Sequence, residues 1–197
     1  MTISETALPA TGAGSTRRVP GQPDMWFFVL FETLLFTAYL GVYLFNRTQH
    51  PVLFLHAQAQ LHLWIGAVNT IILLTSSWVI ARCVEEARAG RFRSALVKAY
   101  LTAACGVAFM GFKVSEWVVE IHAGNTFTSN DFFSYYYFLT AIHFIHLLIG
   151  FVFLGVLVYQ LRSPQRRSQI MVETCATYWH TLDYLWILIF ALLYVVR

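Results

Sequence analysis

The chain has 197 residues, of which 58% are hydrophobic, 17% aromatic and only 12% charged. Ordinary soluble domains carry roughly a quarter charged residues, so this composition predicts a polytopic membrane protein. The net charge of +3 is too small to indicate nucleic acid as a partner. The three cysteines have no CxxC spacing, which indicates free thiols and no disulfide framework.

The chain divides into a short tail and one membrane domain. Residues 1–20 are rich in Ser, Thr, Ala, Gly and Pro and lack the apolar core of a signal peptide, so we interpret them as a flexible N-terminal tail. Residues 21–197 contain five apolar segments, each long enough for the roughly 20 residues that a bilayer core requires. The predicted spans run approximately over residues 24–45, 61–83, 94–121, 131–161 and 173–196. No connecting loop is long enough for a second domain, which excludes a soluble catalytic domain.

Basic residues are distributed unevenly between the ends of these spans. Arg17 and Arg18 precede the first span, and clusters of basic residues follow the second and fourth spans. The first connection has only Arg47, and residues 122–130 contain no Lys or Arg. By the positive-inside rule, the N-terminus lies in the cytoplasm and the C-terminus outside. The predicted fold is therefore an all-α bundle of five transmembrane helices with this orientation.

The last span carries polar side chains at helical spacing within an apolar segment. Glu173, Thr177, His180 and Tyr184 share one stripe, and Asp183 lies on its flank. Ionisable groups are costly at this depth and tend to be retained for a purpose. We expect the stripe to pack against the fourth span, with the rest of the chain completing the bundle around that contact.

The fourth span contributes His143 and His146 near the middle of the membrane. At about 1.5 Å per residue from opposite ends, these side chains reach a depth similar to that of His180 and Asp183. A short connection makes the two helices antiparallel neighbours, so we expect direct or water-bridged contact. Our preferred interpretation is a carboxylate–imidazole network that sets the register of the helices.

The first three spans also contain polar residues. In the first span, burial disfavours the charged form of Glu32, so this carboxyl either hydrogen-bonds a neighbouring helix or takes part in handling protons or lipid. On the third span, Lys113 and Glu116 are three residues apart, which predicts an ion pair near the membrane interface.

In the second span, a spacing of seven places His62, Asn69 and Ser76 on one stripe. We interpret this stripe as a helix-packing surface.

The intramembrane histidines and acids also suggest a metal, because imidazole and carboxylate bind iron, copper or zinc. Their spacing disfavours such a site, since the sequence has neither an ExxH pair nor an HExxH motif. We therefore assign no metal ligand and no catalytic residue. Two alternatives stay open: a stand-alone His-dependent membrane metalloenzyme, and a small proton carrier that uses Glu32 and the His/Asp residues. The sequence has no internal repeat, which disfavours the carrier.

Several motifs together resemble subunit III of the haem-copper oxidases, in the order of that family and over nearly the whole chain from Gly21 onward. They are Asn69–Ser77, Lys113–Trp117, Phe132 and Phe133 followed by Tyr136, His143–His146 with Gly150, and Tyr178–Trp186. Within that family, Met25–Phe28 and Glu173–Ala176 are most similar to the nitric oxide reductase-associated group called NorE. The five-span subunit III of quinol oxidases is the near competitor.

The resemblance implies a non-catalytic accessory subunit in the bacterial cytoplasmic (inner) membrane, as part of a respiratory electron transport chain. Such a subunit binds no haem or copper itself and supports the stability, lipid packing and proton uptake of a catalytic subunit. The expected partner is the catalytic subunit of a haem-copper oxidase or of a nitric oxide reductase, and that partner carries haem, with copper as an option. Membrane phospholipid is a candidate ligand of the chain.

The resemblance also implies roles for individual residues. Glu32 matches the membrane-embedded carboxyl of the family, which is thought to support proton uptake by the neighbouring subunit. Other matches fall on polar positions of the family, some of which contact lipid headgroups or join helices: His143, His146, Glu173, His180 and Asp183. Longer family members have two additional N-terminal spans, which form one arm of a lipid-holding cleft and are not in this sequence.

Overall fold

The computed structural model describes residues 21–165 and 167–196. The tail expected over residues 1–20 lies outside the described residues. The regular secondary structure of the described residues is all helical, with these elements: α1 (Pro23–Gln49), α2 (Pro51–Gln58), α3 (Leu63–Arg88), α4 (Phe92–His122), α5 (Asp131–Arg162), α6 (Gln169–Phe190) and the π-helix η1 (Ala191–Val195). Five of the helices are long and apolar enough to cross a membrane, namely α1, α3, α4, α5 and α6 with its extension through η1. The predicted all-α, five-span fold is confirmed.

The sequence interpretation did not anticipate α2. The helix α1 ends at Gln49, where the backbone N–H of His50 still bonds to the carbonyl of Asn46. Pro51 has no N–H and cannot continue that helix, but it suits the first position of a new one. The chain therefore turns and forms one short helix before α3 begins.

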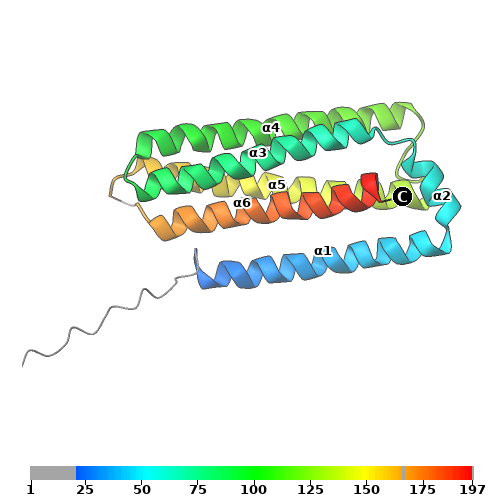
Figure 1. The fold of residues 1–197 in the computed structure, drawn as a ribbon, viewed down its shortest axis with the longest axis horizontal. Helices are drawn as coiled ribbons and strands as arrows, with labels where there is room; N and C mark the ends of the chain where they lie inside the picture. The colour runs from blue at the N-terminus through cyan, green and yellow to red at the C-terminus, as the bar shows by residue number, and fades with distance from the viewer. Residues whose placement is uncertain (1–20, 166, 197) are drawn as a thin grey trace, which may run out of the picture.

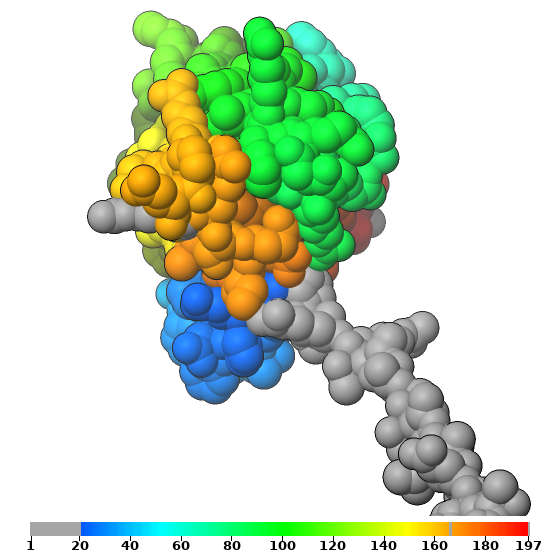
Figure 2. Space-filling view, turned by 90° about the vertical axis from the view of Figure 1, so that its left-hand side faces the viewer, coloured from blue at the N-terminus to red at the C-terminus, as the bar shows by residue number. Residues whose placement is uncertain are grey.

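The long helices run side by side, with their connections at the two ends of the molecule (Figure 1). Helices α3, α4, α5 and α6 form a four-helix bundle, and α1 lies along one side of it. One end holds the start of α1 and the α3–α4 and α5–α6 connections, and the other holds α2, the α4–α5 connection and η1. The view onto the first end shows α1 next to the start of α6 (Figure 2).

Polar contacts attach α1 to α6 at both ends of the molecule. At one end the backbone N–H of Gly21 bonds to Oε2 of Glu173 at 3.3 Å, and that of Gln22 bonds to Oγ1 of Thr174 at 3.0 Å. At the other end the hydroxyl of Tyr43 donates to the carbonyl of Leu192 at 3.3 Å. These contacts attach α1 to α6 at its beginning and near its end.

The core is aromatic and centres on α6. Trp179 and Trp186 are fully buried, and two glycines provide the space for the first of them. A Cβ added at Gly106 of α4 would lie 2.9 Å from the Trp179 ring, and one at Gly150 of α5 would lie 2.7 Å from Cδ1 of Leu182. Both positions therefore need a residue without a side chain, because α6 passes so close to α4 and α5.

Candidate functional site

Three separate groups of buried polar contacts join the helices. The first joins α4, α5 and η1 around Lys113, the second lies between α3 and α6, and the third lies between α1 and α5 at Glu32.

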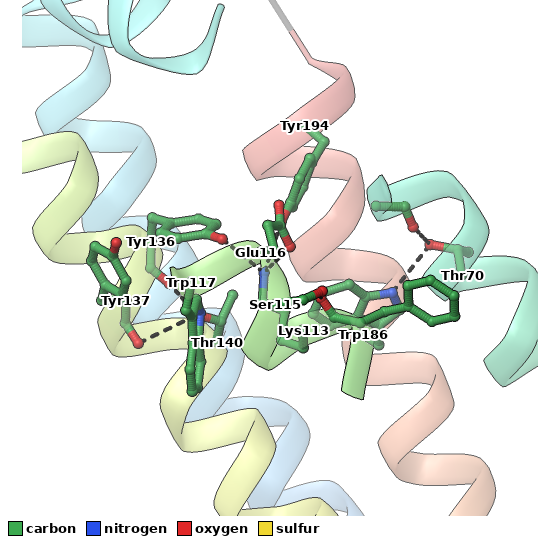
Figure 3. A network of polar contacts seen from close by, with 12 residues as sticks. Thr70, Lys113, Ser115, Glu116, Trp117, Tyr136, Tyr137, Thr140, Trp186 and Tyr194 are labelled. Atoms are coloured by element: carbon green, nitrogen blue, oxygen red, sulfur yellow. Dashed lines mark hydrogen bonds and ion pairs between the residues drawn. The ribbon is translucent and has the colours of Figure 1, made fainter. Parts of the chain in front are cut away.

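Lys113 is the centre of the first group (Figure 3). Its ammonium donates to Oε2 of Glu116 at 2.9 Å and to the hydroxyls of Tyr136 at 3.1 Å and Tyr194 at 2.8 Å. The hydroxyl of Tyr194 in turn donates to Oε1 of Glu116 at 2.7 Å. All three donors of the ammonium are used, which is what a buried lysine needs to stay charged.

The burial of this ion pair was not anticipated from the sequence. Lys113 and Glu116 pair at i, i+3 as expected, and each is only 1% exposed because the surrounding helices cover both side chains. The π-helical turn at the end of α6, marked by the bond from the N–H of Val196 to the carbonyl of Ala191, brings Tyr194 over the pair. A local widening of the helix of this kind has no signal in the hydrophobic pattern, so the sequence did not reveal the third partner.

The second group shows that the polar stripe of α6 faces α3, whereas we expected it to face α5. At the end of the bundle, the guanidinium of Arg88 lies 3.0 Å from Oε1 of Glu173. Further along, Nδ1 of His180 lies 2.7 Å from Oγ of Ser77. The side of α6 toward α4 and α5 is occupied instead by Trp179 and Leu182, which pack over the two glycines. Apolar packing therefore decided the rotation of α6.

Two indole bonds complete the α3–α6 contact. The N–H of Trp179 donates to Oγ of Ser76 at 2.8 Å, and the N–H of Trp186 donates to Oγ1 of Thr70 at 3.1 Å. The hydroxyl of Ser76, which we expected on a helix-packing surface, and that of Thr70 thus each satisfy an indole donor.

Asn69 and His143 are fully buried in the bundle. The ring of His143 lies against the rings of Phe109 and Trp186, with centroids 5.7 Å and 5.3 Å away. Within the described part of the chain, neither side chain has a hydrogen-bond partner. His62 lies apart from them, because it is the exposed residue just before α3 and not a member of the buried stripe.

The third group pairs Glu32 of α1 with His146 of α5, so the carboxylate–imidazole contact forms between these helices and not between α5 and α6. Nε2 of His146 lies 3.2 Å from Oε2 of Glu32, within ion-pair distance but not aligned as a hydrogen bond. Nδ1 of His146 lies 2.8 Å from the carbonyl of Ile142, so it carries the proton and donates. The expected contact of His146 with α6 is limited to its backbone carbonyl, which accepts from the hydroxyl of Tyr178.

A pocket of about 600 Å³ opens beside this pair, at the end of the molecule where α1 begins. Its polar lining includes Asp24, Glu32 and His146, and the rest is mainly apolar and aromatic: Met25, Phe28, Ile149, Phe153, Met171 and Tyr178. The pocket therefore combines a polar floor with walls that suit hydrocarbon.

In residues 21–165 and 167–196, no three His, Cys, Asp or Glu side chains gather in a way that could hold a metal ion. The intramembrane histidines lie in different groups: His143 packs among aromatic rings, His146 pairs with Glu32, and His180 bonds to Ser77.

The fold and these contacts define a multi-pass helical membrane protein in which buried polar side chains join neighbouring helices. Comparison with known families makes this class specific. The chain belongs to the cytochrome c oxidase subunit III family, whose model matches residues 22–196.

Relatives with similar sequences carry two kinds of name. The chain is 32% identical over 183 residues to cytochrome c oxidase subunit 3 of Synechocystis sp., covering 88% of this chain and 77% of the relative. It is 29% identical over 175 residues to quinol oxidase subunit 3 of Bacillus subtilis, covering 86% of this chain and 83% of the relative. It is 31% identical over 176 residues to the quinol oxidase subunit 3 of Bacillus spizizenii, with 86% and 83% coverage. These relatives confirm the resemblance to subunit III of the haem-copper oxidases, while none of the three is named as a NorE protein.

Proposed function

We propose that the chain is a non-catalytic accessory subunit of a haem-copper oxidase in a bacterial cytoplasmic membrane. The observation that carries this proposal is the family match over residues 22–196, which includes all five long helices. In this proposal the chain packs against a catalytic subunit that holds haem and copper, and it holds no redox group of its own.

The outer surface of α1 supports a role inside a membrane assembly. Its large apolar side chains point away from the bundle, with Phe27 76%, Leu34 69% and Phe45 65% exposed. A continuous surface of this kind suits contact with lipid or with the apolar helices of another subunit.

The Glu32–His146 pair supports a role in supplying protons to the partner. Nδ1 of His146 already carries a proton, which it donates to a carbonyl, so Nε2 is the nitrogen that faces Glu32. The contact is favourable when one further proton is shared by the pair, either on Nε2 or on the carboxyl of Glu32. The pair can therefore hold one proton and release it without leaving two like charges together. The pocket beside the pair opens at the end that the positive-inside rule places in the cytoplasm, where protons are taken up.

The same pocket supports binding of a phospholipid. Phe28, Phe153 and Met171 offer an apolar surface for an acyl chain. Gln22 and Asp24 lie at the mouth, where a headgroup would be placed.

Purification of the tagged chain in mild detergent from respiring cells tests the proposal. We expect a haem-containing protein to copurify and the tagged chain to carry no iron, copper or zinc when separated from it. Recovery of a colourless homo-oligomer alone would contradict the accessory role. Stoichiometric metal that disappears in His143→Ala and His180→Ala variants would favour the metalloenzyme alternative.

Glu32→Gln tests the proton role separately. This variant keeps the size of the side chain but cannot lose a proton, so we expect the complex to assemble while its proton-coupled turnover falls. Asp131→Asn is the matched control, because Asp131 is an exposed acid at the opposite end of the molecule. Unchanged turnover in Glu32→Gln, or loss of assembly, would contradict this role.

Nitric oxide as the electron acceptor is the alternative that the resemblance to NorE offers. The names of the relatives favour oxygen, since those proteins are named as subunits of cytochrome c oxidase or quinol oxidase. Measuring oxygen and nitric oxide consumption by the copurified complex distinguishes the two. We expect oxygen uptake, and consumption of nitric oxide alone would favour the alternative.

A further inference from the structure

A second pocket, separate from the one at Glu32, lies between α3 and α6. It has a volume of about 250 Å³ and opens at the same end of the molecule, where the basic α3–α4 connection places the cytoplasm. Its mouth is charged, with the Arg88–Glu173 ion pair and the acid Glu85 among the lining residues. The remaining lining residues are Ala81, Val84, Ala176, Thr177 and His180. A charged mouth of this kind admits water between two membrane helices.

His180 forms the inner part of this pocket and connects it to α3. It lies on α6 about 16.5 Å along the axis from the start of the helix, counted from Gln169 at 1.5 Å per residue. Its Nδ1 lies 2.7 Å from Oγ of Ser77. The imidazole of His180 therefore borders the pocket and also contacts the hydroxyl of Ser77. An imidazole in this position can accept a proton on one ring nitrogen and release a proton from the other ring nitrogen.

Asp183 lies one helical turn deeper than His180 and is only 3% exposed. Ser77 of α3 lies close to its carboxyl group, and the thiol of Cys105 of α4 is within reach of its charge. Within the described residues, neither carboxylate oxygen has a hydrogen-bond partner. A carboxyl in this setting is costly as an anion, because burial without hydrogen bonds disfavours the charged form.

The neighbouring contacts explain the packing of α3 on α6 without Asp183. The two indole N–H groups of Trp179 and Trp186 are satisfied by hydroxyls of α3, and Arg88 is paired with Glu173. Asp183 adds no hydrogen bond to this interface, so its carboxyl calls for a different explanation.

We propose that Asp183 is a proton-holding site that exchanges protons with the cytoplasmic side through His180 and Ser77. On loading, His180 takes a proton from water in the pocket and passes the proton of its other nitrogen to Oγ of Ser77. The hydroxyl of Ser77 then rotates toward Asp183 and gives its own proton to the carboxylate, so Ser77 ends unchanged and Asp183 becomes neutral. Unloading follows the same steps in reverse, which also restores the starting tautomer of His180.

Few other titratable groups face this site. The thiol of Cys105 on α4 and the imidazole of His180 on α6 are its neighbours, and Arg88, Glu85 and Glu173 lie at the mouth of the pocket. The Glu32–His146 pair lies between α1 and α5 and belongs to the other pocket. The two sites are therefore testable independently.

Infrared spectroscopy of the purified full chain in detergent tests the proposal, with its copurifying partner where one is bound. The carboxyl stretching band that disappears in Asp183→Asn is assigned to Asp183. We expect this band to be present at neutral pH and to shift when the protein is transferred to D2O. We expect the shift to be at least tenfold slower in Ser77→Ala and in His180→Phe, because each variant removes one step of the route.

Ala81→Phe tests the pocket as the entrance, since the added ring fills the space beside His180. We expect the same slowing of exchange. Ala108→Phe is the matched control, because Ala108 is an exposed residue of α4 outside the pocket. Glu32→Gln is a second control, and neither control should change the exchange rate of the Asp183 band.

Three outcomes would overturn the proposal. The first is the absence of a protonated Asp183 band over the whole pH range in which the protein is folded. The second is a band that does not shift in D2O, and the third is equal exchange rates in the wild type and in Ser77→Ala. If Ala81→Phe does not fold, the comparison of Ser77→Ala with the wild type still decides the question.

Discussion

Lys113 shows at the scale of one residue how a charge is kept inside the bundle. Its ammonium has three acceptors, and one of them, Glu116, carries the opposite charge. Taking both charges out of water is costly, and the attraction between them together with the hydrogen bonds offsets that cost. Removing only one partner leaves the other charge buried and uncompensated.

Lys113→Met should therefore lower the free energy of unfolding by about 3–5 kcal/mol. The double variant Lys113→Met/Glu116→Leu should recover at least half of that loss, because no buried charge remains. Unfolding of the detergent-solubilised protein by a denaturant measures both values. Lys98→Met is the control, since Lys98 is partly exposed at the end of the molecule and should change stability by less than about 1 kcal/mol. A silent Lys113→Met would show that the ion pair does not support the fold.

Close approach of backbones decides the packing at the scale of the helices. Helix α5 has one glycine on each of two faces: a Cβ at Gly150 would meet Leu182 and Trp179 of α6, whereas nothing lies within 4 Å of a Cβ at Gly155. Replacing each glycine by alanine can therefore separate the effect of the contact between α5 and α6 from the effect of helix propensity.

Gly150→Ala should destabilise the protein by about 1–3 kcal/mol, because α5 and α6 must move apart to admit the methyl group. Gly155→Ala should leave stability unchanged or raise it by up to about 1 kcal/mol, since alanine favours the helix more than glycine does. The midpoint of thermal unfolding in the same detergent compares the two. Equal effects of the two substitutions would contradict the close contact between α5 and α6.

At the scale of the whole molecule, basic residues gather at one end. Arg91 lies in the α3–α4 connection and Arg93 at the start of α4, while Arg162 ends α5 and Arg167 lies in the α5–α6 connection. The α4–α5 connection at the other end has no Lys or Arg. Both proposed proton sites open toward the basic end. Their roles in proton uptake therefore depend on that end facing the cytoplasm.

Reporter fusions measure this orientation. Green fluorescent protein inserted after Gly90 should fluoresce, because the α3–α4 connection is expected in the cytoplasm. Alkaline phosphatase inserted after Gly124, in the α4–α5 connection, should be active on the outer side. The reversed pattern would place both pockets on the outside and remove the basis for proton uptake through them.

Composition, span lengths and charge distribution were sufficient to predict the class of fold. Each span must satisfy its backbone hydrogen bonds internally, so a helix is the only option for an isolated apolar segment of that length in a membrane. The motifs were also sufficient to predict the family, because the residue types in a motif such as Tyr178–Trp186 are read directly from the sequence. The partners of the polar residues could not be predicted, since a sequence shows which residues share a helical face but not which neighbour that face meets.

Tertiary packing determined which partners the polar residues meet. The rotation of α6 follows from Trp179 and Leu182 over Gly106 and Gly150, and it turned His180 toward Ser77 of α3. The position of α1 places Glu32 next to His146, and the π-helical turn places the hydroxyl of Tyr194 next to the ammonium of Lys113. In each case the steric fit of large side chains between helices set the geometry, and the polar contacts formed where that fit allowed. Helix identity is a local property of the chain, whereas pairing between helices depends on how all five fit together at once.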